Sequence, residues 1–84
     1  MIPIHELLNR IRWDRAFSEG EFSIGYYDRL KAEIIIIPLD KAIFDKEDHF
    51  NFSFVDETGE VYTIPLHRIK QVYKNGELIW HREH

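Results

Sequence analysis

The sequence predicts an α+β domain in which an N-terminal helix packs on a mainly antiparallel sheet of five or six strands. Apolar residues recur with helical spacing near the start, and the spacing changes to two further along the chain. An Asn-Gly dipeptide near the end joins two β-rich segments, as expected of a hairpin. We expect residues 1–84 to form a single domain, because folding units usually contain about 50 to 200 residues.

The helix is predicted from four apolar residues at positions i, i+3, i+4 and i+7, namely Ile4, Leu7, Leu8 and Ile11. Pro3 precedes them, at a place where a helix tolerates proline. We expect the helix to end near residues 13–14.

The first two strands follow from alternation and from β-branched residues. Residues 22–27 alternate between apolar and small or polar side chains, as in a half-buried strand. The isoleucine run 34–37 is typical of a central strand covered on both faces, and it ends at Pro38. Residues 28–31 are expected to join these strands as a hairpin.

The remaining strands are predicted around turn signals. Residues 39–48 are the least regular part of the chain, and we expect a helical turn near residues 42–44. Phe50, Phe52 and Phe54 alternate with polar residues, which predicts a third strand whose aromatic face lies in the core.

After a turn at residues 56–59, a fourth strand covers 61–64. Two more strands, 69–73 and 77–80, flank the dipeptide 75–76, where a type I′ turn requires positive φ at both residues. One helix cannot cover so large a sheet, so the other face is expected to be partly exposed and available for binding.

Composition limits the function. The chain has no cysteine, a net charge of −4 and 44% hydrophobic residues, which indicates a globular domain without disulfides or thiolate metal sites. A net negative charge argues against coating long nucleic acid, which requires neutralising many phosphates. It does not exclude a local cluster of arginines that grips one or two phosphates.

No apolar run approaches the roughly 20 residues that span a bilayer. The first residues also lack the features of a signal peptide. We therefore expect a soluble, cytoplasmic protein with no membrane partner.

The motifs of metal sites and of hydrolases are absent from the sequence. The five histidines are scattered, no pair has ligand spacing, and His81 and His84 are expected at a mobile end. There is no glycine-rich phosphate loop and no nucleophile elbow. We therefore predict no metal, no cofactor and no catalytic residue.

The most promising polar cluster follows Pro65, which should end the fourth strand because it cannot donate to the ladder. His67 and Arg68 then lie at a corner where backbone amides are often free, and together these groups suit an anion. Alternatively, His67 caps a turn and Arg68 pairs with a carboxylate.

Other arginines, at positions 10, 12, 15 and 29, are further candidates for phosphate contact. Asp14 and Asp28 stand next to Arg15 and Arg29, so local ion pairs are the simpler interpretation. Trp13 and other aromatic residues are suited to stacking on bases, although most aromatics in so small a domain belong to the core.

Four segments in order resemble one family: residues 8–14 (LNRIRWD), 24–29 (IGYYDR), 64–69 (IPLHRI) and 75–80 (NGELIW). Together they are similar to the RNA cyclic group end recognition domain, a small domain found alone in archaea. In larger proteins it occurs beside RNA-end-processing and phosphoesterase modules. The resemblance covers nearly the whole chain and implies binding of RNA ends that carry a 2′,3′-cyclic phosphate or a similar group.

The polar positions that the resemblance implies for RNA or phosphate binding are Arg12, Asp14, Asp28, Arg29, His67 and Arg68, with Trp13 and Trp80 as base-stacking candidates. The sequence departs from the family at His81, where an acidic residue is expected, so no role is assigned to the tail.

Two hypotheses of different classes follow. The first is a non-catalytic RNA-end binding module whose partners are RNA ends and RNA-processing proteins. The second is a protein-interaction or scaffold domain that uses the exposed sheet face or an edge strand. A cyclic phosphodiesterase is a third, less favoured alternative.

Overall fold

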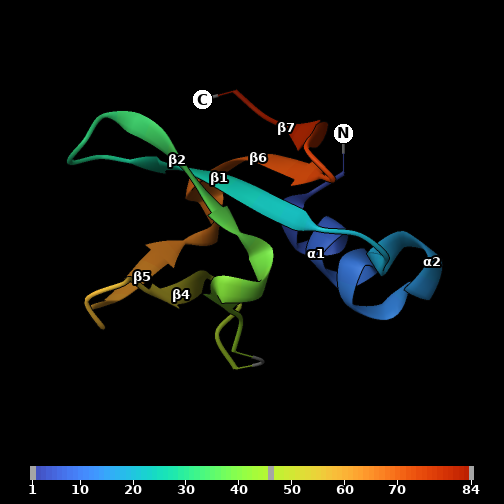
Figure 1. Cartoon of the computed structure of the whole chain (residues 1–84), viewed down its shortest axis with the longest axis horizontal. Helices are drawn as coiled ribbons and strands as arrows, with labels where there is room; N and C mark the ends of the chain where they lie inside the picture. Colours follow the sequence, from blue (N-terminus) through green and yellow to red (C-terminus); the bar gives the residue numbers. More distant parts are fainter. Residues whose placement is uncertain (1, 46, 84) are drawn as a thin grey trace.

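The computed structural model describes residues 2–45 and 47–83. An N-terminal helix is followed by seven strands in two antiparallel sheets, one of four strands and one of three (Figure 1). The α+β class and the antiparallel pairing are confirmed, whereas the prediction of one sheet with five or six strands is imprecise, because the described strands divide between two sheets. No helix in these two ranges is long and apolar enough to cross a membrane.

The predicted helix is present as α1, Ile4–Trp13. The four apolar residues identified by their spacing are its buried residues. Asp14 ends α1 with an extended backbone, and its side chain accepts a hydrogen bond from the backbone N–H of Phe17. The same aspartate thereby begins a short second helix, α2, Arg15–Ser18.

The four-stranded sheet has the order β2-β1-β6-β7. Its strands are β1 Phe22–Asp28, β2 Glu33–Pro38, β6 Ile69–Lys74 and β7 Glu77–His81. The two central strands, β1 and β6, supply the fully buried side chains Ile24, Ile69 and Val72. The predicted turn between β6 and β7 is confirmed, because Asn75 and Gly76 both have positive φ, 52° and 82°.

Strand β2 lies at the edge of this sheet, so the prediction of a central strand for residues 34–37 is wrong. Ile36 is 50% exposed on the outer face. A Cβ placed on Gly25 would lie 2.8 Å from Ile36 Cδ1 and 2.9 Å from Ile34 Cγ2. These isoleucines therefore cover the backbone of the neighbouring strand at a glycine, which explains apolar residues on both faces of an edge strand.

The three-stranded sheet contains β3 Ala42–Ile43, β4 Asn51–Val55 and β5 Val61–Pro65, in the order β3-β4-β5. The helical turn expected near residues 42–44 is displaced: the chain forms a 3₁₀ turn earlier, η1 Leu39–Lys41, and then a strand. The core assignment of Phe50 is also wrong, because β4 begins one residue later and Phe50 is 79% exposed.

Both changes of sheet occur at a proline followed by a 3₁₀ turn. Strand β2 ends at Pro38 and continues through η1 into β3, while β5 ends at Pro65 and continues through η2, Leu66–Arg68, into β6. Proline has no N–H for the ladder, so pairing stops there, and the 3₁₀ turn redirects the chain. These two corners explain why the strands divide into two sheets.

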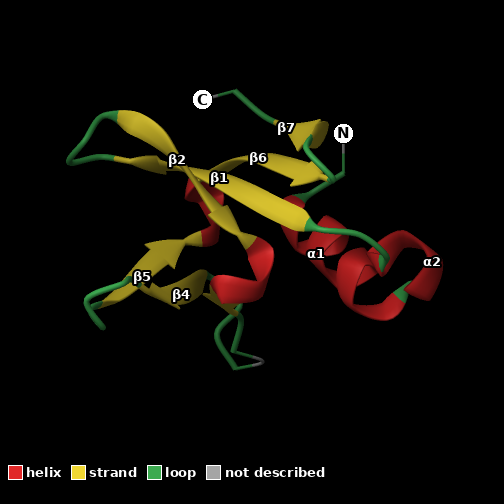
Figure 2. Cartoon of the chain, viewed as in Figure 1, coloured by secondary structure: helices red, strands yellow, loops and turns green. Residues whose placement is uncertain are grey.

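The core lies where α1 and the three-stranded sheet pack against one face of the four-stranded sheet (Figure 2). Phe52 is 1% exposed and joins the two sheets, with its ring centroid 6.1 Å from that of Tyr26 in an edge-on arrangement. Trp80 is also buried, and its indole N–H donates to the carbonyl of Ile2 at 2.8 Å. The opposite face of the four-stranded sheet is partly exposed, as predicted.

The two phenylalanines that precede and follow Asn51 allow a matched stability test. Phe52→Ala removes a ring that contacts both sheets, and we expect it to lower the free energy of unfolding by about 3–5 kcal/mol. Phe50→Ala removes an exposed ring, and we expect a change within about 0.5 kcal/mol. Urea unfolding followed by circular dichroism measures both; equal losses would contradict the core described above.

Candidate functional site

The predicted corner is the turn η2, which joins β5 to β6 and lies against both α1 and β1. The N–H of Leu66 donates to the carbonyl of Phe50 at 2.7 Å, and the N–H of Ile69 donates to the carbonyl of Leu66. These bonds fix the backbone of the turn, while His67 is exposed and Arg68 is half-buried. The corner therefore presents an imidazole and a guanidinium on a rigid backbone.

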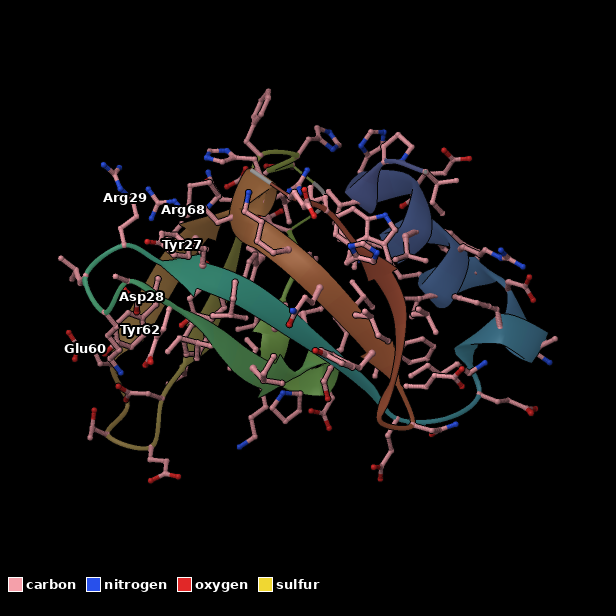
Figure 3. All side chains as sticks on the ribbon, turned by 90° about the horizontal axis from the view of Figure 1, so that it is seen from above. Tyr27, Asp28, Arg29, Glu60, Tyr62 and Arg68 are labelled. Carbon is pink, nitrogen blue, oxygen red and sulfur yellow. The ribbon has the colours of Figure 1, made fainter. Side chains whose placement is uncertain are left out.

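Strand β1 brings Arg29 to the same end of the molecule. Tyr26 is paired with Ile69, so Tyr27 lies beside the position of Arg68, and Arg29 follows in the β1–β2 turn. Figure 3 shows the side chains of Arg29 and Arg68 at one end, both directed toward solvent. Two arginines that are 39 positions apart in the sequence thus form one basic pair, which we call the Arg29–Arg68 pair.

Four cations of the predicted site lack side-chain partners within the described part of the chain. Arg12, Arg29, His67 and Arg68 form no hydrogen bond or ion pair there through their side chains. Asp28 instead accepts hydrogen bonds from the backbone N–H groups of residues 30 and 31, at 2.9 and 3.2 Å, and so closes the β1–β2 turn. The expected Asp28–Arg29 ion pair is therefore not formed. The guanidinium groups of Arg29 and Arg68 can both bind an anion.

The acidic groups near the Arg29–Arg68 pair lie in the turn between β4 and β5, where Asp56 accepts hydrogen bonds. Glu60 and Tyr62 lie at the same end as the arginine pair (Figure 3). Asp56 accepts hydrogen bonds from the backbone of Thr58 and Glu60 and from the hydroxyl of Tyr62. The hydrogen bond from the Thr58 side chain is the main cause of a lowered pKa of Asp56. These carboxylates reduce the positive potential near the pair without occupying the guanidinium groups.

Arg12 and Trp13 lie elsewhere, in a groove of about 600 Å³ between α1 and the segment before β4. Trp13 is 78% exposed. Leu66, the first residue of η2, also lines this groove. The turn η2 therefore contributes to two regions. Its first residue, Leu66, lines the groove with Arg12 and Trp13, and its last residue, Arg68, belongs to the Arg29–Arg68 pair.

Besides Asp28, two further predicted residues, Asp14 and Trp80, have structural roles. Asp14 caps α2, and its Oδ2 lies 3.8 Å from Nε of Arg10. Trp80 is only 6% exposed and is hydrogen-bonded inside the core. The Trp80 ring is therefore mostly enclosed, with Cζ of Arg82 5.3 Å from its centroid.

Arg82 is a residue that the sequence did not indicate. Its Nη2 donates to the carbonyl of Leu66 and its Nε to the carbonyl of Ile69, each at 2.8 Å. Its own N–H donates to Lys70, so the tail continues along β6 where a mobile end was expected; His84 lies outside the described residues. Burial lowers the pKa of Arg82. No sequence signal reveals this contact, because it depends on how β7 is placed beside β6.

A metal centre has no support in residues 2–45 and 47–83, where no group of three or more histidine, aspartate or glutamate side chains could hold an ion. Anion binding by arginine and histidine is the chemistry that the site geometry favours.

Arg82 should stabilise the corner. We expect Arg82→Ala to lower the free energy of unfolding by about 1–3 kcal/mol, because two carbonyl groups lose their charged donor. The amide of Ile69 should also exchange faster with solvent, as measured by hydrogen exchange and NMR. His81→Ala removes an exposed neighbouring side chain and serves as the control. Unchanged exchange at Ile69 would show that Arg82 does not hold the turn.

Tyr62 gives a pH test of the adjacent turn. Its pKa is raised from 10.0 to about 12, first because its hydroxyl donates to Asp56. The protonated phenol therefore stabilises the fold below pH 10, and this contribution is lost as the pH rises toward 12. Asp56→Asn should return the pKa toward 10, as followed by NMR of the Tyr62 ring. A pKa that does not change in this variant would contradict the hydrogen bond.

A family model, the MJ1316 RNA cyclic group end recognition domain, matches residues 1–82. Searches of curated proteins and of solved structures gave no match. The family's name describes a domain that recognises a group at RNA ends and does not describe a reaction. Because the match spans nearly the whole sequence, the chain belongs to the MJ1316 RNA cyclic group end recognition domain family.

Proposed function

We propose that this chain is a non-catalytic module that binds RNA termini, with a preference for ends that carry a 2′,3′-cyclic phosphate. The observation that carries the proposal is that Arg29 and Arg68 lie at one end of the molecule, near the turn that holds His67, with no side-chain partner among the described residues. The family name supports RNA ends as the ligand. The proposal adds the chemical form of the end and the residues that hold it.

The chemistry of a cyclic phosphate suits this corner. The group carries one negative charge and has no free 2′-hydroxyl, so a few well-placed donors are sufficient. Arg29 and Arg68 supply planar guanidinium groups that can bind two phosphoryl oxygens, and His67 supplies one further donor. The net charge of −4 is compatible with such a ligand, because a single anion responds to local potential.

Recognition without catalysis agrees with the surroundings of His67. Opening a cyclic phosphate by acid–base catalysis requires a base and an acid placed on either side of the phosphorus. The imidazole of His67 has no hydrogen-bond partner within the described residues that would orient it as a base. A positioned general base is usually held by a third group.

The partner and compartment belong to the same proposal. A domain that holds processed RNA ends would work in the cytoplasm beside the enzymes that make or remove those ends. The rival proposal is a protein-interaction domain, and the unpaired edge of β2 with the exposed Ile36 supports it.

The test compares RNAs of one sequence that end in a 2′,3′-cyclic phosphate, a 3′-phosphate or a 3′-hydroxyl. Fluorescence anisotropy at moderate salt should show the tightest binding to the cyclic end. We expect Arg29→Ala and Arg68→Ala each to weaken this binding about tenfold, the effect of losing one charge-assisted hydrogen bond. Binding to the 3′-hydroxyl RNA should change much less.

Lys41→Ala is the matched control, since it removes one exposed positive charge from the other proline corner. Circular dichroism of each variant checks that the fold is intact. Equal affinity for the three ends would refute recognition of the cyclic group. Absence of RNA binding, with the wild-type protein folded, would favour the protein-interaction alternative.

A further inference from the structure

The groove between α1 and the segment before β4 has no assigned ligand. We propose that it binds the nucleobase of the terminal nucleotide whose phosphate lies at the Arg29–Arg68 pair, so the inference rests on the proposed function. Its volume of about 600 Å³ lies within the range of small-molecule sites, roughly 300–1,000 Å³. The residues that carry the inference are Trp13, Phe50, Asp45 and Asp48.

Two exposed aromatic rings line this groove. Trp13 and Phe50 are 78% and 79% exposed, although each is large and apolar. Neither ring packs in the core. Of the phenylalanines whose alternation predicted a strand, Phe52 is the one that is fully buried. Exposed aromatic rings beside a basic corner are the usual platform for an unpaired base, because every base has a stacking face.

The polar groups of the groove favour a base over a second phosphate. Asp45 and Asp48 both line it, so two carboxylates offset the positive charge of Arg12 in the same groove, which the Arg29–Arg68 pair does not share. Hydrogen bonds, first of all from the N–H of Phe50, lower the pKa of Asp48, so this group is ionised at neutral pH. A carboxylate accepts hydrogen bonds from the N–H edge of a base. The groove and the arginine pair therefore complement the two unlike parts of one nucleotide.

The backbone connects the two subsites. Asp48 accepts hydrogen bonds from the N–H groups of Phe50 and Asn51, at 3.0 and 3.1 Å, and this fixes the chain on either side of the Phe50 ring. The carbonyl of Phe50 accepts from Leu66, which lines the groove and immediately precedes His67. The groove and the anion corner are thus adjacent parts of one hydrogen-bonded unit.

The charge of the groove, as well as its shape, favours a nucleobase as the occupant. The two carboxylates already accept from the backbone N–H groups of Glu47, Phe50 and Asn51. An apolar peptide segment would bring no donor for their remaining acceptor positions, whereas a base supplies both a flat apolar face and N–H groups. The guanidinium of Arg12 also lines the groove and has no partner in residues 2–45 and 47–83, so it is available to the sugar or to an adjoining phosphate.

The test uses two RNAs that both end in a 2′,3′-cyclic phosphate, one with a terminal guanine and one with a terminal abasic ribose. We expect Trp13→Ala and Phe50→Ala each to weaken binding of the guanine RNA roughly tenfold. Both variants should bind the abasic RNA as the wild type does. Arg68→Ala should weaken binding of both RNAs, because it acts on the phosphate.

Conservative variants separate stacking from folding. Trp13→Phe and Phe50→Tyr keep an aromatic ring and should retain most of the affinity for the guanine RNA. If the alanine variants lose the same affinity for both RNAs, or for neither, the groove does not bind the terminal base and the proposal is overturned.

A phosphate-free probe distinguishes this inference from the proposed function. Guanosine should quench the fluorescence of Trp13, and Phe50→Ala should weaken that quenching; Trp13→Phe corrects for the signal of the buried Trp80. Quenching by guanosine in a protein that does not discriminate RNA ends would support the groove and refute the cyclic-phosphate preference. Absence of quenching would refute the groove whatever the RNA ends show.

Discussion

A proline at the end of a strand has no N–H to donate to the neighbouring strand, so pairing stops there. Such a proline stands at both points where the chain passes from one sheet to the other. Pro38 and Pro65 are each followed by a 3₁₀ turn whose first residue is a leucine. The rest of the structure depends on these corners, because they place the aromatic side of the small sheet against β1 and α1. The second corner also carries His67 and Arg68, so the turn that completes the core presents the candidate site.

The aspartates and the arginines have different roles in the structure, which the net charge of −4 does not reveal. Asp14, Asp28, Asp48 and Asp56 each accept backbone hydrogen bonds in a turn or at a helix start. These bonds satisfy the carboxylates locally and leave the guanidinium groups of Arg29 and Arg68 without partners in the described chain. An acidic protein can in this way offer a basic surface that is the size of one phosphate, which is the electrostatic condition for recognising an end and not a long strand.

Features that depend on neighbouring residues were predictable from the sequence, and features that depend on distant pairing were not. The apolar stripe of α1 and the Asn75-Gly76 turn are local, and both predictions are confirmed. The division into two sheets depends on which strands pair, and alternation alone carries no such information. The position of Phe50 fits the alternation of β4. The backbone N–H of Phe50 donates to Asp48 instead, and the strand begins one residue later. The corner of the candidate site was predictable from Pro65, whereas its contact with Arg82 was not.

The contact of Arg82 with the corner has a consequence for how the site is assembled. The two carbonyl groups that it binds belong to residues 66 and 69, which leave the ribosome before it does. Those carbonyl groups must remain without their guanidinium partner until residue 82 has been added to the chain. The bonds of the corner are therefore complete only once residue 82 is in place, after every residue of η2 and β6.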